Sequence, residues 1–149
     1  METEERCNRF CGSIDNIAKK ITRYKNVCAE RYGLSSRHVV PLLQLYACPE
    51  GLTAANLAEQ CQVDKSFVSR VTKELTEAGF LHYQGRNQNI VLTEKGKQTA
   101  SALMEYANGA VLKVDGAASP GELEVFYRML NRVDLNLGEL VNEGKRENG

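Results

Sequence analysis

The sequence predicts a mainly α-helical fold with a small two- to three-stranded β-wing. Two observations predict the helices: apolar residues recur at helical spacing over most of the chain, and capping residues and glycines divide that pattern into segments. A third observation predicts the wing, because two short apolar runs flank a segment rich in turn residues. The 149 residues suffice for one medium domain or for a domain with an attached assembly element, and 42% hydrophobic residues are typical of a globular protein.

Composition and charge exclude several classes of protein. The 19 basic side chains balance 19 acidic ones, which argues against a protein that coats nucleic acid by bulk charge. No apolar run approaches the roughly 20 residues that cross a bilayer, and the first residues lack a signal-peptide core. We therefore expect a soluble, cytoplasmic protein with no membrane partner.

Cysteine and histidine usage gives no sign of a metal or cofactor. Five cysteines are an odd number without secretory context, and two histidines are too few for a zinc signature. The sequence also lacks a nucleophile-base-acid pattern, a phosphate loop and paired carboxylates in a recognisable motif. We expect no catalytic residues, no metal, no cofactor and no enzymatic activity.

Two helices are predicted before residue 50. The first covers residues 7–32, where apolar side chains recur at three- and four-residue steps, and Gly33 follows as a residue that adopts left-handed backbone at little cost. Ser35 or Ser36 can cap the second helix, which runs to about residue 47. Pro41 lies inside it and is expected to bend it.

A pair of shorter helices is predicted next. Thr53 caps residues 54–60, residues 61–63 turn the chain, and Asp64 caps a helix that ends before Gly79. Two strands at residues 80–83 and 90–92, joined by a polar turn, then form the wing.

Two long helices are predicted at the C-terminal end. Thr93 caps the first, which runs toward residue 114. Ser119-Pro120-Gly121-Glu122 opens the second with a cap, a proline at the first helical position and a capping-box glutamate. Its apolar face extends to residue 141, and we expect the polar tail 142–149 to fray.

The order of elements is helix, helix, helix-turn-helix, wing, helix, helix. A core made by residues 34–97 cannot cover the apolar stripes of the first, fifth and sixth helices. We therefore expect these stripes to be buried against another subunit.

The predicted helix over residues 64–78 carries a polar, cationic face. Val68, Val71 and Leu75 can dock one side of this helix on a core. The residues of the other side recur at i, i+3, i+4 and i+7: Ser66, Ser69, Arg70 and Lys73. Hydroxyl and guanidinium groups on a short exposed face suit the major groove of DNA. The alternative is an ordinary amphipathic surface helix.

Several ordered motifs resemble those of the MarR/SlyA family of transcriptional regulators. They are Gly-Leu-Thr-Ala-Ala-Asn-Leu-Ala-Glu (51–59), Val-Asp-Lys-Ser-Phe-Val-Ser-Arg-Val-Thr-Lys-Glu-Leu (63–75), Glu-Ala-Gly-Phe-Leu (77–81) and Val-Leu-Thr-Glu-Lys-Gly (91–96). The similarity is close from about residue 34 to residue 106.

The resemblance implies a single MarR-type domain over residues 1–149. Residues 34–97 would form its winged helix-turn-helix DNA-binding lobe, and residues 7–33 and 98–142 its helical dimerisation region. The resemblance further implies a homodimer, most often a repressor, that binds a pseudo-palindromic, inverted-repeat operator in double-stranded DNA. Two-fold symmetry agrees with half-sites about 10 bp apart.

The resemblance also implies which residues of the helix-turn-helix face DNA. They are Lys65, Ser66, Ser69, Arg70, Thr72 and Lys73. Arg70 is the best candidate for a base or phosphate contact, and its alternative role is a surface ion pair with Glu74 or Glu77. Lys65 and Lys73 are expected to contact phosphates.

The wing departs from the family pattern. Arg86 falls on the arginine of the family's Asp-x-Arg element, but Gln84 stands where the aspartate would be, and the hairpin is shorter. Arg86 can still enter a narrow minor groove, and Asn87 can supply a further contact. A solvated turn is the alternative.

The resemblance suggests how such a regulator is controlled. Many members bind a small aromatic or phenolic effector, and Arg37 and His38 lie beside the place where the family pocket lies. Other members sense oxidation, and Cys7 and Cys11 are redox candidates because they lie four residues apart on one helix face. In the alternative readings, Arg37 and His38 are solvated or paired with a helix end, and the cysteines are small apolar residues.

The zinc-binding branch of the family is not expected, because residues 93–114 contain no histidine. Two alternative functions stay open: a cysteine-based redox-sensing regulator of the same fold, and a winged-helix module that contacts protein instead of DNA.

Overall fold

A computed structural model describes residues 1–83 and 88–149 of the chain. The chain divides into two compact units, residues 1–108 and residues 109–149, and each is described by itself. Within the described ranges, no helix has an apolar stretch long enough to span a membrane.

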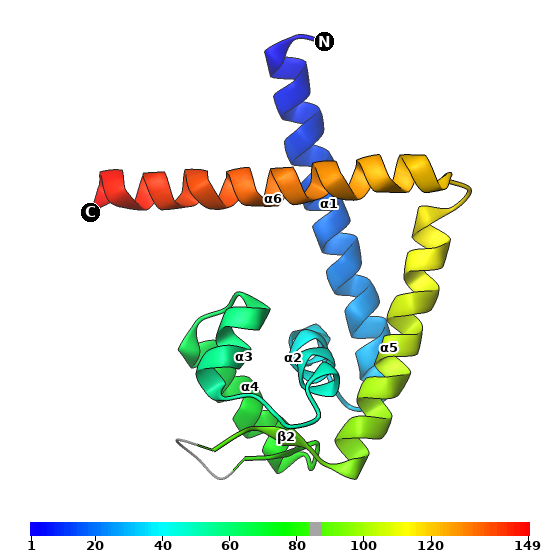
Figure 1. The fold of residues 1–149 in the computed structure, drawn as a ribbon, viewed down its shortest axis with the longest axis vertical. Helices are drawn as coiled ribbons and strands as arrows, with labels where there is room; N and C mark the ends of the chain where they lie inside the picture. The colour runs from blue at the N-terminus through cyan, green and yellow to red at the C-terminus, as the bar shows by residue number, and fades with distance from the viewer. Residues whose placement is uncertain (84–87) are drawn as a thin grey trace. The chain divides into compact units, whose positions relative to one another are not determined.

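The first unit confirms the predicted class, which is mainly helical with a small antiparallel sheet (Figure 1). Its α5 continues into the second unit. The elements are α1 (Thr3–Glu30), α2 (Ser36–Ala47), α3 (Ala54–Cys61), α4 (Lys65–Glu77), β1 (Leu81–His82), β2 (Val91–Leu92) and α5 (Glu94–Asp115).

The predicted caps explain where the shorter helices begin. The Thr53 hydroxyl oxygen accepts a hydrogen bond from the Asn56 backbone N–H at 3.1 Å at the start of α3. The Thr93 hydroxyl oxygen does the same for the Gly96 N–H at 3.0 Å at the start of α5. The chain leaves α1 through Gly33 with φ of +69°, the left-handed conformation expected there.

Helix α1 begins at Thr3, four residues before the predicted start. The expectation rested on the apolar stripe, which begins at Cys7. Glu4 and Glu5 in the first turn favour the positive end of the helix dipole, so the polar segment before the stripe is helical as well.

The wing is shorter than predicted. Strand β1 pairs antiparallel with β2, with Leu81 opposite Leu92 and His82 opposite Val91. Ile90, predicted to lie in the second strand, instead forms an isolated antiparallel bridge with Leu52. The bridge holds the segment before α3 against the root of the wing.

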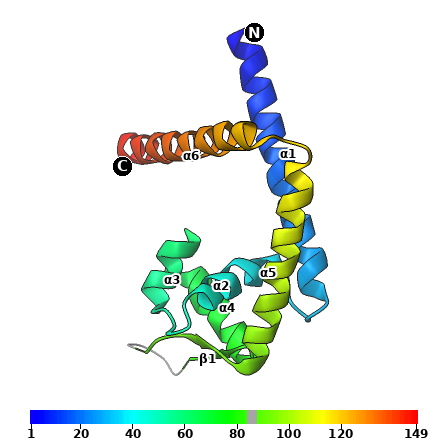
Figure 2. The same cartoon turned by 45° about the vertical axis from the view of Figure 1, so that its right-hand side comes forward.

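The core of the first unit lies where α2, α3 and α4 meet the wing, and the ends of α1 and α5 close it (Figure 2). The largest fully buried side chains are Phe80, Leu42, Leu45, Leu57, Leu75, Ile90, Val71 and Thr72. Val68, Val71 and Leu75 of α4 all point into this core, as the sequence predicted. Tyr24 of α1 donates a hydrogen bond to the Tyr106 carbonyl at 3.2 Å, which joins α1 to α5.

The second unit contains the end of α5 and α6 (Pro120–Asn148). The predicted capping box is present, because the Ser119 N–H donates to a Glu122 carboxylate oxygen at 2.8 Å and the Glu122 N–H donates back to the Ser119 hydroxyl at 3.3 Å. The expectation that residues 142–149 fray is wrong, since α6 continues to Asn148, with Lys145 and Arg146 favouring its negative end.

Candidate nucleic-acid interface

Helix α4 begins with a cap that also orders its first exposed side chain. The Asp64 carboxylate accepts hydrogen bonds from the Phe67 N–H at 2.7 Å and from the Ser66 hydroxyl at 2.9 Å. These bonds, the one from Phe67 first, lower the pKa of Asp64 below its ordinary value. The carboxylate is therefore charged near neutral pH, and it caps the start of α4.

The outward side of α4 carries hydroxyl and cationic groups. Five of the predicted DNA-facing residues are exposed there: Lys65, Ser66, Ser69, Arg70 and Lys73. Lys73 makes one loose ion pair, 4.0 Å from Glu77 at i+4. Such surface pairs are weak and salt-sensitive, so the Lys73 ammonium stays available for other anions.

Thr72 corrects the prediction for this face. Its side chain is buried, with 2% exposure, and its hydroxyl donates to the Val68 carbonyl at 2.7 Å. Thr72 lies four residues after Val68 and therefore on the same, core-facing side of the helix. The prediction that Thr72 faces DNA is wrong.

Arg37 and His38 lie at the start of α2 and contact α4. The Arg37 guanidinium donates to both carboxylate oxygens of Glu74, at 3.0 and 3.2 Å, and His38 Nε2 lies 2.7 Å from one of them. The hydrogen bond from His38, followed by that from Arg37, lowers the pKa of Glu74. The alternative role for Arg70, an ion pair with Glu74 or Glu77, is absent between the described residues.

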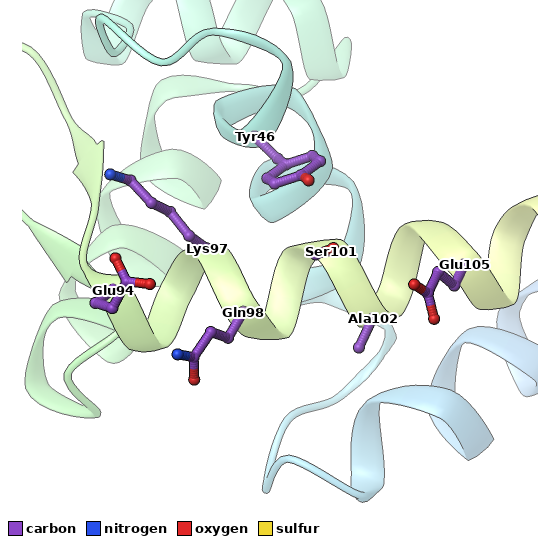
Figure 3. A pocket seen from close by; sticks show the side chains of 7 residues that line it. All are labelled: Tyr46, Glu94, Lys97, Gln98, Ser101, Ala102 and Glu105. Carbon is purple, nitrogen blue, oxygen red and sulfur yellow. The ribbon is translucent and has the colours of Figure 1, made fainter.

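These contacts bear on the effector candidates. Two surface hollows among the described residues are lined by side chains other than those of Arg37 and His38. The first, of about 530 Å³, lies between Tyr46 at the end of α2 and α5, where Lys97 and Ser101 line it (Figure 3). In this structure Arg37 and His38 pair with the Glu74 side chain of α4.

The redox candidates are exposed, but the surroundings of Cys11 do not favour a reactive thiolate. Cys7 and Cys11 both lie on the surface of α1. A hydrogen bond with Cys7, and then repulsion from a negative charge on the Cys7 sulfur, raise the pKa of Cys11. A redox-sensing thiol generally has a lowered pKa, so the direction is opposite to the one required.

The wing contacts fall partly outside the described residues. The predicted DNA contacts of Arg86 and Asn87, and the substitution at Gln84, lie in the segment 84–87, which the structure does not describe. The root of the wing is held firmly: Lys95 donates to the Ala78 carbonyl at 2.8 Å and lies 4.3 Å from the centre of the Phe80 ring.

Sequence reasoning missed Glu74 and Lys95 as structural residues. Glu74 and its partners are more than thirty residues apart, and no local pattern links them. The only local signal was a histidine three residues after Ser35, at the capping-box position where glutamate or glutamine is usual. No group of three or more potential metal ligands occurs in the part of the chain that the structure describes.

These elements define a winged helix-turn-helix protein: α3 and α4 form the helix-turn-helix, a two-stranded wing follows, and α4 exposes hydroxyl and cationic groups. A family model for the IclR helix-turn-helix domain matches residues 42–85, which include α3 and α4. Its structural neighbours include transcriptional regulators of the MarR/SlyA family.

Three solved structures illustrate the similarity. The regulator SlyA is 24% identical, with a TM-score of 0.77 over 87% of this chain and 94% of that chain. A MarR-type protein from Listeria monocytogenes in complex with a 26mer DNA is 19% identical, with a TM-score of 0.76 over 87% and 89%. CouR from Rhodococcus jostii RHA1, bound to p-coumaroyl-CoA, is 18% identical, with a TM-score of 0.69 over 80% and 87%.

No curated protein sequence matches this chain. The structural likeness covers most of both chains at low identity, and it establishes the fold. The chain therefore has the winged-helix fold of MarR family transcription regulators.

Proposed function

We propose that this protein is a MarR family transcriptional regulator that binds double-stranded DNA through the exposed side of α4. One observation carries the proposal: a capped helix, docked on the core by Val68, Val71 and Leu75, turns Ser66, Ser69, Arg70 and the two lysines outward. Arginine and hydroxyl groups at this position match the donors that read base edges, and the lysines match phosphate contacts.

The proposal includes a homodimer. Within the second unit, helix α6 buries none of its residues, although large apolar side chains recur along it. These residues include Phe126, Leu130, Leu137, Leu140 and Val141, each more than 40% exposed. Helix α1 likewise exposes Ile17 and Ile21 at helical spacing. Exposed apolar surface of this extent is typical of a subunit interface, and a second copy of the chain is the proposed partner.

Two-fold symmetry sets the form of the DNA site. Two copies of α4 would enter successive major grooves, so the operator is proposed to be an inverted repeat with half-sites about 10 bp apart. We further propose that binding represses transcription, as is most frequent in this family, and that the protein works in the cytoplasm.

Control by a small aromatic or phenolic effector is the preferred regulatory proposal. The structurally similar CouR was solved with p-coumaroyl-CoA, which contains such a group. Redox control is the weaker proposal, because the raised pKa of Cys11 opposes formation of a thiolate. A thermal-shift screen with aromatic acids, followed by DNA titration, would identify an effector.

The proposed function is tested by selecting duplexes from a random-sequence pool and titrating them with the protein at two salt concentrations. Lys65 and Lys73 of two subunits would make about four phosphate contacts, so affinity should fall about a hundredfold between roughly 50 and 200 mM salt. The selected sequences should contain an inverted repeat. Absent or salt-independent binding would contradict the proposal and favour a winged-helix module that contacts protein.

A further inference from the structure

Glu74 is an acidic residue on the helix that we propose binds DNA. A carboxylate near a phosphate backbone weakens DNA binding electrostatically, so a structural role is the expected reason for Glu74 on this helix. Glu77, one turn further on, is 68% exposed in its side chain and makes only the loose pair with Lys73. Glu74 differs, because two side chains of α2 hold it.

The contact with Arg37 has the geometry of a strong pair. The guanidinium donates through Nε and one terminal nitrogen to the two carboxylate oxygens, at 3.0 and 3.2 Å. Two parallel bonds fix the direction of the carboxylate as well as its distance. The Glu74 side chain therefore has a defined orientation toward α2, although it is 40% exposed.

His38 adds a second, buried contact. Its Nδ1 accepts a hydrogen bond from the Ser35 N–H at 3.1 Å, so the neutral ring carries its proton on Nε2. That nitrogen lies 2.7 Å from Glu74 Oε2 and donates to it. The imidazole is only 8% exposed, and it joins the N-terminal cap of α2 directly to the last turn of α4.

The start of α2 is anchored on its other side as well. The Ser36 N–H donates to the Asn26 side-chain oxygen of α1 at 2.7 Å. The first turn of α2 therefore contacts both α1 and α4 through adjacent residues, and it positions α4 relative to the rest of the first unit.

We propose that Glu74 is a positioning residue for DNA recognition: its bonds to Arg37 and His38, added to the core packing of α4, set the rotation of this helix about its axis. This inference rests on the proposed function. The rotation decides which side chains of α4 meet base edges, and Arg70 lies one turn before Glu74. Holding Glu74 toward α2 also keeps it from pairing with Arg70 at i+4, which leaves that guanidinium available for DNA.

The test compares Glu74→Gln with Glu77→Gln, because both substitutions remove one negative charge from the same helix. Charge alone predicts that both variants bind DNA as well as the parent or more tightly. Positioning predicts that only Glu74→Gln weakens binding, by about tenfold, to a duplex selected by the parent from a random pool. Fluorescence anisotropy measures both affinities, and circular dichroism checks that the fold is retained.

A second readout separates positioning from loss of structure. A rotated α4 loses base contacts but keeps phosphate contacts, so the affinity of Glu74→Gln for random-sequence DNA should equal or exceed that of the parent. Arg37→Ala should also weaken binding to the selected duplex. The double variant, Arg37→Ala with Glu74→Gln, should bind no more weakly than the weaker of the two single variants, because both substitutions remove the same interaction.

Three outcomes would overturn the inference. Equal affinity of Glu74→Gln and Glu77→Gln for the selected duplex would show that charge alone acts. An equal loss of affinity of Glu74→Gln for the selected duplex and for random-sequence DNA would show a general loss of structure. If the parent binds no DNA, the proposed function fails and the inference fails with it, whereas the first two outcomes leave the proposed function intact.

Discussion

Gly96 of α5 lies directly against the backbone carbonyl of Phe80. A Cβ atom at position 96 would overlap the Phe80 carbonyl oxygen and lie 3.2 Å from the Leu92 side chain. The obstacle is backbone, which cannot move aside as a flexible side chain can. This close approach fixes the start of α5 against the root of the wing, together with the hydrogen bond from the Thr93 N–H to the same Phe80 carbonyl at 3.0 Å.

Gly96→Ala should therefore destabilise the protein by about 2 kcal/mol, a typical cost of overpacking a closely packed site. The matched control is Gly109→Ala in the same helix, where a Cβ meets no atom within 4 Å. Alanine is the better helix former, so the control should gain about 0.5–1 kcal/mol. Denaturant unfolding measures both values, and shifts in the same direction would contradict the packing described.

The charge on Asp64 should make stability depend on pH in the acid range. Folding lowers the pKa of Asp64 through the bonds from Phe67 and Ser66, so the unfolded chain binds the proton more readily. The contribution is complete above the ordinary pKa of 3.8 and is lost as pH falls through the lower folded value. Asp64→Asn keeps a capping oxygen but not the charge.

The difference in Tm between the parent and Asp64→Asn should therefore be present at neutral pH and should vanish below the folded pKa. Thermal melts over a series of acidic buffers measure it. A difference in Tm that persists at the lowest pH, or grows there, would show that the carboxylate charge does not stabilise the cap.

The dimer proposal predicts opposite behaviour for two leucines on α6. Leu137 lies on the apolar stripe with Leu130 and Leu140, whereas Leu135 is 69% exposed on the other side of the helix. Leu137→Asp should dissociate the dimer at micromolar concentration, because it places a charge in an apolar interface. Leu135→Asp should leave the dimer intact. Sedimentation equilibrium distinguishes them, and a monomeric parent would refute the proposal outright.

Thr72→Val should leave DNA binding unchanged within about twofold. The Thr72 side chain is buried and its hydroxyl bonds to the carbonyl of its own helix, so valine, of similar shape, fits without reaching solvent. The comparison variant is Ser69→Val on the exposed side, which should weaken binding to the selected duplex. If Thr72→Val weakens binding as much as Ser69→Val, the assignment of the two sides of α4 is wrong.

Most elements were predictable because their signals are local. Apolar spacing, the caps Thr53, Asp64 and Ser119, and the left-handed glycine at position 33 each act within a few residues. Local signals also led to errors at the ends of elements. Helix α1 starts before its apolar stripe, and α6 continues beyond the end of its apolar face. Once a helix is nucleated, each added residue gains one backbone hydrogen bond, so polar residues can extend it.

The candidate site was only partly predictable. Exposure of Arg70 and Lys73 follows from the helical repeat, and the same repeat, applied from Val68, would have placed Thr72 inside. The contact of Glu74 with Arg37 and His38 depends on how α2 packs on α4, which no short-range pattern encodes. The pKa of Cys11 likewise depends on the side-chain geometry of the pair, beyond its four-residue spacing.

The most direct test of the account is DNA binding by Arg70→Ala, with Arg146→Ala as the control. Both substitutions remove one exposed arginine, but only Arg70 lies on α4. Titration of a duplex selected by the parent should show Arg70→Ala about tenfold or more weaker, the range expected for loss of a base-specific arginine contact, and Arg146→Ala within about twofold of the parent. Equal binding by Arg70→Ala and the parent would contradict the claim that this side of α4 contacts DNA.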